Sequence, residues 1–100
     1  MDKMERKIIM FYGEECVHCH TMMPIIDEIE KEVKGRIKFD RREVWHNKKN
    51  QKLMDIFKKE IKEACSGGLG VPVFIDDKNK KAFCGEAPYE EFKKWLTKKK

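Results

Sequence analysis

The chain has no long apolar run, and this absence excludes several kinds of protein. Its one apolar run near the start, Ile8–Tyr12, spans five residues, which is too short for the hydrophobic region of a signal peptide. No stretch approaches the roughly 18 apolar residues that a membrane-spanning helix needs. We therefore expect a cytoplasmic protein that does not bind membranes, although a mature chain whose signal peptide had been removed would look the same.

Proline and glycine are also scarce, at three and six of 100 residues, and no segment rich in them marks a linker. Apolar residues make up 40% of the chain and charged residues 41%, which suits a modest core beneath a densely charged surface. We expect one monomeric domain over residues 1–100, with its core at about 7–97 and a basic tail at 98–100.

A continuous basic surface is missing as well. The net charge is +5, but much of the excess lies at Lys78–Lys81 and Lys98–Lys100, and acidic residues are interleaved elsewhere. Solvated lysines on a turn and at a chain end explain this pattern. We therefore expect no nucleic-acid partner.

The apolar pattern that is present predicts alternating strands and helices. Ile8–Tyr12 suits a strand buried on both faces, and the spacing from Cys16 to Lys34 is helical, with Pro24 expected to kink that helix. The later elements are a strand at 37–44, a helix that begins after Asn47 or Asn50 and ends at Ala64, strands at 71–75 and 81–84, and a helix that Pro88 opens. The order β-α-β-α-β-β-α predicts an α/β fold with one four-stranded mixed sheet flanked by helices.

The stretch Cys16-Val17-His18-Cys19-His20 is compatible with three chemistries. Cys-x-x-Cys is a redox dithiol motif, Cys-x-x-Cys-His is the attachment pattern of a c-type haem, and the cluster offers zinc ligands. Haem attachment would use His20 as a ligand, but small c-type cytochromes are helical and this motif follows a buried strand. Structural zinc would need a second ligand pair, so that Cys65 and Cys84 would have to converge on the motif. We expect no metal and keep zinc as an alternative.

Several features occur together in an order that is typical of one family. They are a buried strand at 8–12, a short loop, Cys16–Cys19 at a helix start, Pro24 five residues after the second cysteine, Val71-Pro72 at a later strand, and Gly85 after the last strand. This set resembles the thioredoxin family, and in particular small thioredoxin- and glutaredoxin-type oxidoreductases. The resemblance covers about residues 7–97 and corresponds to the minimal thioredoxin-like fold, without the additional N-terminal strand and helix of thioredoxin itself.

The resemblance implies a thiol–disulfide oxidoreductase that exchanges disulfides with protein or small thiol substrates through Cys16 and Cys19. It implies no cofactor beyond this redox-active disulfide. Its partners would be disulfide-containing proteins and an electron donor such as a thioredoxin reductase or a low-molecular-weight thiol. Two alternatives from other classes are a non-catalytic binding module with this fold and a cysteine-based zinc-binding protein.

The positions of the two cysteines assign their roles. A helix N-terminus carries unpaired N–H groups and a partial positive charge, which stabilise a thiolate there. We expect Cys16 to be the exposed nucleophile and Cys19, one turn further on the apolar stripe, to be the buried resolving thiol. A protonated His18 would stabilise the Cys16 thiolate and make the pair more oxidising than thioredoxin, whereas Glu14 and Glu15 oppose this. The alternative is that His18 is an uninvolved surface residue.

A substrate site is implied beside the dithiol. By the resemblance, a cis peptide bond between Val71 and Pro72 would turn the Val71 backbone outward for a substrate strand to pair with, and Gly85 would lie close by. The alternative is an ordinary trans proline at a strand start. Trp45, at the end of the second strand, is expected to form an aromatic wall for a peptide, or else to cover the sheet.

The resembled topology also places two further cysteines. The first, second and last strands end at the same edge of the sheet, so Cys84 should lie near the rim of the dithiol, while the place of Cys65 is less determined. We hypothesise a second redox pair, Cys65–Cys84, or a relay to Cys16. The alternative is two isolated thiols.

Two residues depart from the family pattern. Met10 occupies the position where thioredoxin has a buried aspartate behind its dithiol, so the usual proton acceptor is absent. Glu15 replaces the aromatic residue before the motif, which suggests a recognition surface for different, more basic partners.

Overall fold

The computed structural model describes residues 6–33, 35–67 and 70–97, so the basic tail expected at 98–100 lies outside the described residues. The elements follow in the order β1 (Arg6–Tyr12), α1 (Val17–Glu32), β2 (Ile37–Glu43), α2 (Lys48–Ile56), α3 (Lys58–Ala64), β3 (Val73–Asp76), β4 (Lys81–Cys84) and α4 (Tyr89–Thr97). Within these described ranges, no helix combines the length and the apolar character needed to cross a bilayer.

The four strands form one mixed sheet in the order β2-β1-β3-β4. β1 pairs in parallel with β2, with Ile8 opposite Phe39, and antiparallel with β3, with Ile9 opposite Ile75. β3 and β4 form an antiparallel hairpin. β4 therefore runs in the same direction as β1 and β2, and all three end at one edge, as the sequence predicts for an α/β fold of this type.

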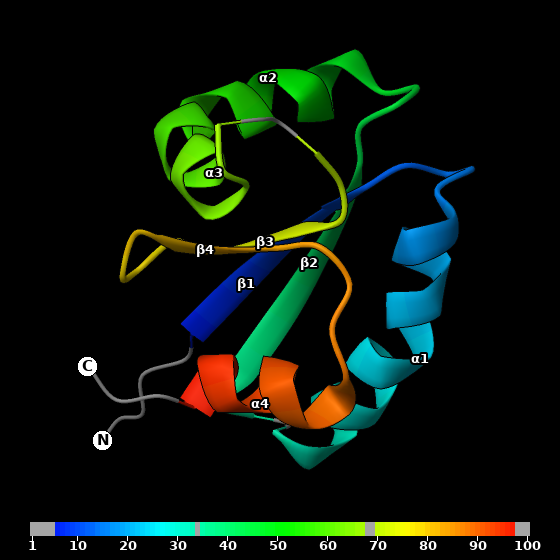
Figure 1. Cartoon of the computed structure of the whole chain (residues 1–100). Coiled ribbons are helices and arrows are strands. Elements are labelled where there is room, and N and C mark those ends of the chain that lie inside the picture. Colours follow the sequence, from blue (N-terminus) through cyan, green and yellow to red (C-terminus); the bar gives the residue numbers. More distant parts are fainter. Residues whose placement is uncertain (1–5, 34, 68–69, 98–100) are drawn as a thin grey trace.

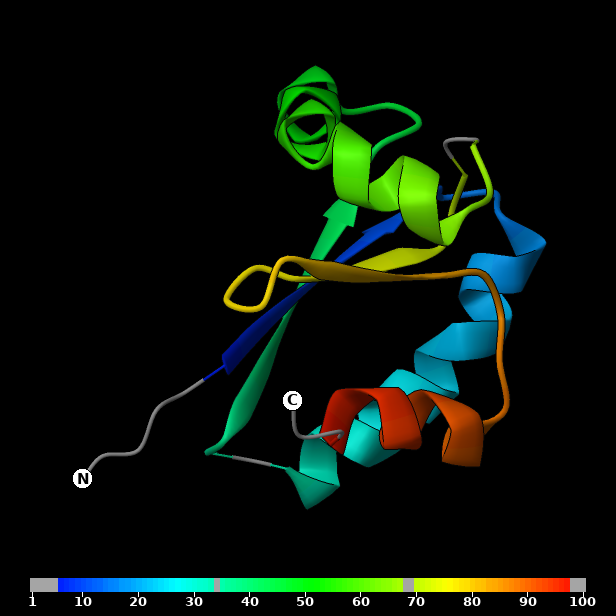
Figure 2. The same ribbon diagram turned by 60° about the vertical axis from the view of Figure 1, so that its left-hand side comes forward.

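Helices cover both faces of the sheet, because side chains alternate along the buried strand β1. Ile8 and Met10 point into a core cluster with α1 and α4, whereas Ile9 and Phe11 point into a second cluster with α2 and α3. Figures 1 and 2 show these two helical layers on opposite sides of the sheet. We call the two clusters the α1–α4 core and the α2–α3 core.

The prediction of a single helix between Asn47 and Ala64 is wrong, because the chain forms two helices with a break at Phe57. The Asn47 side chain caps α2 by accepting the Asn50 N–H at 3.0 Å. Phe57 leaves helical geometry (φ −102°, ψ 18°) and is buried in the α2–α3 core with Ile61. The break lets both apolar side chains reach the sheet, and Ile56 remains 71% exposed.

Two other element boundaries differ slightly from the prediction. The strand expected from Val71 begins at Val73, since Val71 and Pro72 lie outside the β3 ladder and proline has no N–H to donate. The first helix ends at Glu32 and runs without interruption through Pro24. The kink expected at Pro24 stays a prediction.

Candidate active site

The two motif cysteines form a disulfide at the start of α1. Cys16 is the N-cap residue of this helix, and its Cα lies 5.2 Å from that of Cys19. The Cys19 backbone N–H donates to the Cys16 sulfur at 3.1 Å. The sulfur therefore takes the capping position that a side-chain oxygen of serine or aspartate usually fills. It lies among the first backbone N–H groups of the helix, which have no carbonyl acceptor in a preceding turn. A negative charge on this sulfur would be stabilised there.

The expectation of an exposed Cys16 is wrong for this disulfide form. Cys16 is 5% exposed and Cys19 is fully buried, and both belong to the α1–α4 core. The Val71 carbonyl oxygen lies 3.9 Å from the Cys16 sulfur, so a segment 55 residues away covers the motif. The predicted order of burial, with Cys19 deeper than Cys16, nevertheless agrees with the structure.

The segment that covers Cys16 is held by the end of β4. The peptide bond between Val71 and Pro72 is cis. The Pro72 carbonyl accepts the Gly85 N–H at 2.8 Å, and Gly85 adopts φ +93°, which favours glycine. Val71, Pro72 and Gly85, which the sequence assigned to substrate binding, therefore lie together beside the dithiol.

These residues line a groove of about 580 Å³ whose other wall is the first half of α1. The remaining lining residues are His18, Thr21, Ile25, Glu86, Ala87 and Pro88. The His18 Nδ1 atom lies 2.6 Å from a carboxylate oxygen of Glu86, and both side chains are solvent-accessible. Sequence reasoning missed Glu86, whose one available clue was its position directly after Gly85.

Trp45 packs on the loop that precedes the dithiol motif. Its ring covers Gly13, on which an added Cβ would lie only 2.2–2.7 Å from three ring atoms. The indole is nevertheless 48% exposed, and with Met54, Asp55 and Val71 it lines a hollow of about 440 Å³. Trp45 is therefore half-exposed at the rim, as a wall for a bound peptide would be.

Gly13→Ala is expected to displace the Trp45 ring, because the new methyl group and the indole cannot occupy the same space. We expect a loss of about 1–3 kcal/mol in the free energy of unfolding. In a Trp95→Phe background, which leaves Trp45 as the remaining tryptophan, its emission should shift to the red. Gly70→Ala is the matched control, since an added Cβ there meets no atom within 4 Å. Unchanged emission in Gly13→Ala would contradict the close packing.

A second disulfide joins Cys65, the C-cap residue of α3, to Cys84 at the end of β4, with their Cα atoms 5.4 Å apart. The pairing agrees with the hypothesis of a second cysteine pair and not with two isolated thiols. Both residues are half-buried and pack against the α2–α3 core, on the other face of the sheet from Cys16 and Cys19. The four cysteines do not converge, so they offer no four-sulfur zinc site.

Comparisons with known proteins agree with this geometry. The sequence model of the thioredoxin family, described as "Thioredoxin", matches residues 1–66. The chain belongs to the thioredoxin family. A solved structure, that of chloroplastic thioredoxin z, superposes with a TM-score of 0.66 over 92% of this chain and 75% of the other. The two sequences are 18% identical, so this similarity bears on the fold alone. No curated protein matches the chain at significance.

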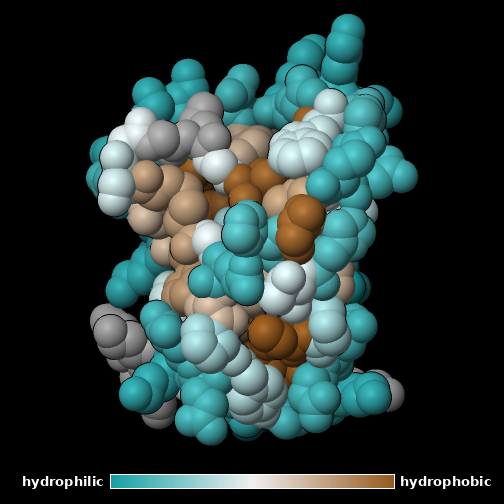
Figure 3. All heavy atoms as spheres, turned by 45° about the vertical axis from the view of Figure 1, so that its right-hand side comes forward, coloured by the Kyte–Doolittle hydropathy of each residue, from teal (hydrophilic) through white to brown (hydrophobic). Residues whose placement is uncertain are grey.

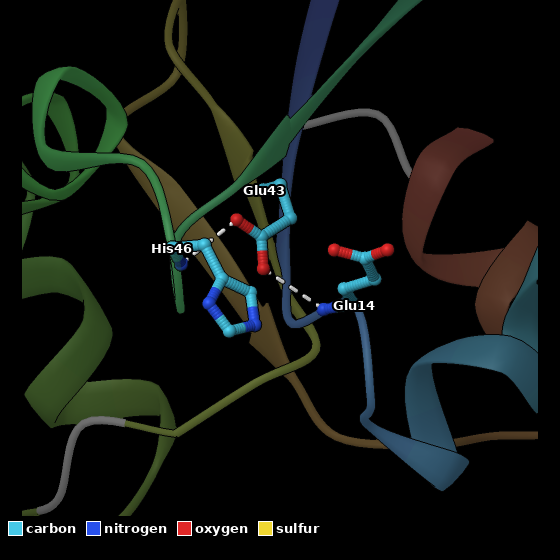
Figure 4. Close-up of side chains that lie close together, drawn as sticks. All are labelled: Glu14, Glu43 and His46. Carbon is cyan, nitrogen blue, oxygen red and sulfur yellow. Dashed lines mark hydrogen bonds between the residues drawn. The ribbon is translucent and has the colours of Figure 1, made fainter.

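Within this thioredoxin-family site, the loops after β1 and β2 are joined by one carboxylate. Glu43 accepts the backbone N–H groups of Glu14 at 2.9 Å, His46 at 2.9 Å and Trp45 at 3.2 Å. Figure 4 shows the carboxylate between the N–H groups of His46 and Glu14. Burial by itself would raise the pKa of Glu43, but these N–H groups hold it below its ordinary value.

Glu14, Glu43 and His46 also have ligand atoms within 4.8 Å of one another, which is a spacing that a metal ion could use. The Glu43 oxygens are already hydrogen-bonded to the backbone, so their evident role is to hold the two loops together. Exposed acidic groups are common without a metal.

This thioredoxin-family chain has Met10, fully buried in the α1–α4 core, where thioredoxin has its aspartate.

His46 is expected to titrate above the ordinary histidine range. The hydrogen bond to Glu15, at 2.8 Å, and the charge of that carboxylate raise the pKa of His46. Because the folded-state pKa is raised, the pair stabilises the fold at acidic pH and loses its contribution as the pH rises through that pKa. NMR titration should show a high midpoint that falls in Glu15→Gln and changes less in Glu14→Gln. Equal midpoints in wild type and Glu15→Gln would contradict the pairing.

Proposed function

We propose that this chain is a thiol–disulfide oxidoreductase that uses Cys16 and Cys19 to exchange disulfides with protein or small thiol substrates. The observation that carries the proposal is a Cys-x-x-Cys disulfide at a helix N-terminus in a thioredoxin-family fold, with the Val71 carbonyl oxygen 3.9 Å from the Cys16 sulfur. Membership of the family makes this class of chemistry plausible, and the geometry supplies the two sulfurs that the reaction needs.

The proposed reaction moves two electrons in two exchange steps. In the reduced protein, the Cys16 thiolate attacks one sulfur of a substrate disulfide, and the other substrate sulfur leaves as a thiolate and takes a proton. The Cys19 thiolate then attacks the Cys16 sulfur of this mixed disulfide. The second substrate thiol is released, and the Cys16–Cys19 disulfide forms. The reverse sequence oxidises a substrate dithiol.

Substrate binding is proposed at the backbone of Val71 and in the groove beside it. A peptide in extended conformation could pair with the Val71 backbone and bring its own sulfur towards Cys16, with Pro72 and Gly85 forming the adjoining wall. Val17, which is 73% exposed, and Trp45 would provide apolar contacts on either side of the dithiol. Figure 3 shows that apolar side chains reach the surface between hydrophilic ones on the side of the molecule that carries α1.

His18 is proposed to tune the dithiol. A positive charge on its imidazole would stabilise the reduced form through the Cys16 thiolate, while the carboxylate of Glu86 at 2.6 Å offsets that charge. The proposed partners are disulfide-containing proteins and, as electron donor, a thioredoxin reductase or a low-molecular-weight thiol. We propose a cytoplasmic location and no cofactor beyond the disulfide.

Insulin reduction by dithiothreitol tests the proposal directly. We expect the wild-type protein to accelerate precipitation of the insulin B chain, and Cys16→Ser to reduce the rate to that of dithiothreitol alone. Serine cannot attack a disulfide sulfur at neutral pH, so this variant removes the reaction while keeping the size of the side chain. A wild-type rate equal to that of dithiothreitol alone would favour a non-catalytic binding module of the same fold, and a Cys16→Ser variant as active as an active wild type would refute the assignment of Cys16 as nucleophile.

The reduction potential of the Cys16–Cys19 pair, measured against glutathione, decides the direction of electron flow. A value near about −270 mV, that of thioredoxin, implies a reductase, whereas a value above about −200 mV implies an oxidase or isomerase. We expect the higher range, because the sequence has His18 before the second cysteine. His18→Leu should then lower the potential, and an unchanged potential would make His18 a bystander.

A further inference from the structure

The Cys65–Cys84 disulfide is not used in the two exchange steps proposed for Cys16 and Cys19. Its residues are half-buried, so this bond is more open to solvent than the disulfide of the motif. The two disulfides lie on opposite faces of the sheet, because Cys16 and Cys19 belong to the α1–α4 core and Cys65 and Cys84 pack on the α2–α3 core. Direct exchange between the two pairs, the relay considered above, would have to reach from one face of the sheet to the other.

Val71 connects the two sulfur pairs physically. Among the half-buried hydrophobic residues of the described chain, Val71 alone packs against both core clusters. Its carbonyl oxygen lies 3.9 Å from the Cys16 sulfur on one face. A change in the position of the Val71 segment is therefore transmitted to Cys16.

The second disulfide holds the chain on both sides of Val71. Cys84 is the register partner of Val73, and the next residue, Gly85, donates its N–H to the Pro72 carbonyl at 2.8 Å. On the other side, the chain leaves α3 at Cys65 through Ser66 (φ +60°) and Gly67 (φ +97°). The bond closes this connection into a ring with Cys84, across a sequence separation of 19 residues.

The helix ends place the two pairs in opposite electrostatic settings. Cys16 is at the N-terminus of α1, where a thiolate is stabilised, whereas Cys65 is at the C-terminus of α3, where the free carbonyl groups disfavour a thiolate. Stabilising the thiolate favours the reduced form of a cysteine pair. Cys16–Cys19 should therefore be reduced first, and Cys65–Cys84 should remain oxidised while it turns over.

We propose that Cys65–Cys84 is a second redox site, harder to reduce than Cys16–Cys19, which in its oxidised form clamps the Val71 segment beside Cys16. Its substrate is an external dithiol. A thiolate of that dithiol attacks one of the two sulfurs, and the other leaves as a thiolate and takes a proton. The second thiolate of the reagent then closes the reagent's own disulfide, so that two electrons reach the protein and Cys65 and Cys84 become thiols.

The order of reduction can be measured without any enzymatic assay. The oxidised protein is equilibrated in buffers with increasing ratios of reduced to oxidised dithiothreitol, quenched with acid, alkylated and analysed by peptide mass spectrometry. We expect the midpoint for Cys65 and Cys84 at a ratio at least tenfold higher than that for Cys16 and Cys19. Coincident midpoints, or the opposite order, would overturn the proposal.

The clamp itself is tested by two reagents whose rates should change in opposite directions. The half-reduced protein, with Cys65–Cys84 intact, is compared with the fully reduced protein. Opening the clamp should uncover Cys16 and increase its alkylation by iodoacetamide at least threefold, since this small reagent needs no strand pairing. Exchange of Cys16 with a peptide disulfide should slow at least threefold, because the Val71 backbone is no longer held in place.

Each outcome of this comparison has one meaning. An unchanged rate of alkylation excludes the clamp. Faster reaction of Cys16 with both reagents indicates general loosening of the fold and also contradicts the clamp. The measurement of exchange with the peptide disulfide rests on the proposed function. If neither form of the protein exchanges with the peptide, that function fails. The alkylation rates still decide whether the clamp exists. The Cys65→Ser/Cys84→Ser variant should behave like the fully reduced protein, with circular dichroism as the control for folding.

Discussion

Cys19→Ser is expected to trap substrates as stable mixed disulfides and to lose turnover. The attacking sulfur, Cys16, is retained in this variant, so the first exchange step still takes place. The second step needs a thiolate within bonding reach of Cys16, and Cys19 supplies it from one helical turn away, with the two Cα atoms 5.2 Å apart.

Non-reducing electrophoresis and intact mass measurement detect this trap. With a disulfide-containing protein as substrate, Cys19→Ser should give a covalent adduct that dithiothreitol releases, and insulin reduction should fall to the uncatalysed rate. Cys16→Ser is the matched control and should form little adduct. Adduct formation by Cys16→Ser and not by Cys19→Ser would mean that the two sulfurs have exchanged roles.

Asp76→Ala is expected to destabilise the fold by about 1.5–3 kcal/mol, the usual effect of removing a hydrogen bond to a charged group at a partly buried site. Asp76 is 3% exposed at the end of β3, and its carboxylate lies 2.6 Å from the Arg6 guanidinium. It also accepts the Asn79 side-chain N–H at 2.8 Å. Arg6 in turn donates to the Leu96 carbonyl at 2.6 Å, so the loss of Asp76 disturbs the contact between the sheet and α4.

Urea unfolding of Asp76→Ala and of Asp77→Ala provides the measurement and its control. Asp77 is the adjacent carboxylate, but it is exposed and pairs with Lys80 at 3.5 Å, so its removal should cost less than about 1 kcal/mol. Similar losses of unfolding free energy in the two variants would show that the pair with Arg6 stabilises the fold no more than an exposed ion pair does.

The stability that Asp76 contributes should depend on pH. Burial by itself would raise the pKa of Asp76, but the Asn79 hydrogen bonds and the Arg6 guanidinium hold it below its ordinary value. Because the folded-state pKa is lowered, the contribution is present above the unfolded-state pKa and is lost as the pH falls through the folded-state pKa. The difference in unfolding free energy between wild type and Asp76→Ala should therefore shrink in acid.

Much of the fold follows from patterns within short windows of sequence. The apolar run at 8–12 and the apolar stripe along 16–34 predicted β1 and α1, and Asn47 was one of the two caps expected to begin α2. The break at Phe57 was missed, because a continuous helix and a broken one have the same local apolar spacing. It depends on how Phe57 and Ile61 pack beneath the sheet, which no window of a few residues contains.

The candidate site was predictable in its parts but not in its assembly. The Cys16–Cys19 motif and its helix start were recognised from the sequence, together with Val71-Pro72. The exposure of Cys16 was wrongly predicted, since burial depends on a carbonyl group 55 residues away. The contact between His18 and Glu86, 68 residues apart, was missed for the same reason.

The sequence by itself determined the order of the strands, the family resemblance and the place of Cys16 at a helix N-terminus. These follow from hydrophobic periodicity, capping and motif spacing, which act over a few residues. Only the tertiary structure decided that Cys65 pairs with Cys84, that this pair lies across the sheet from the dithiol, and that Val71 contacts both core clusters. Those relations depend on which faces of the strands meet which helices, and that is settled when the two cores pack.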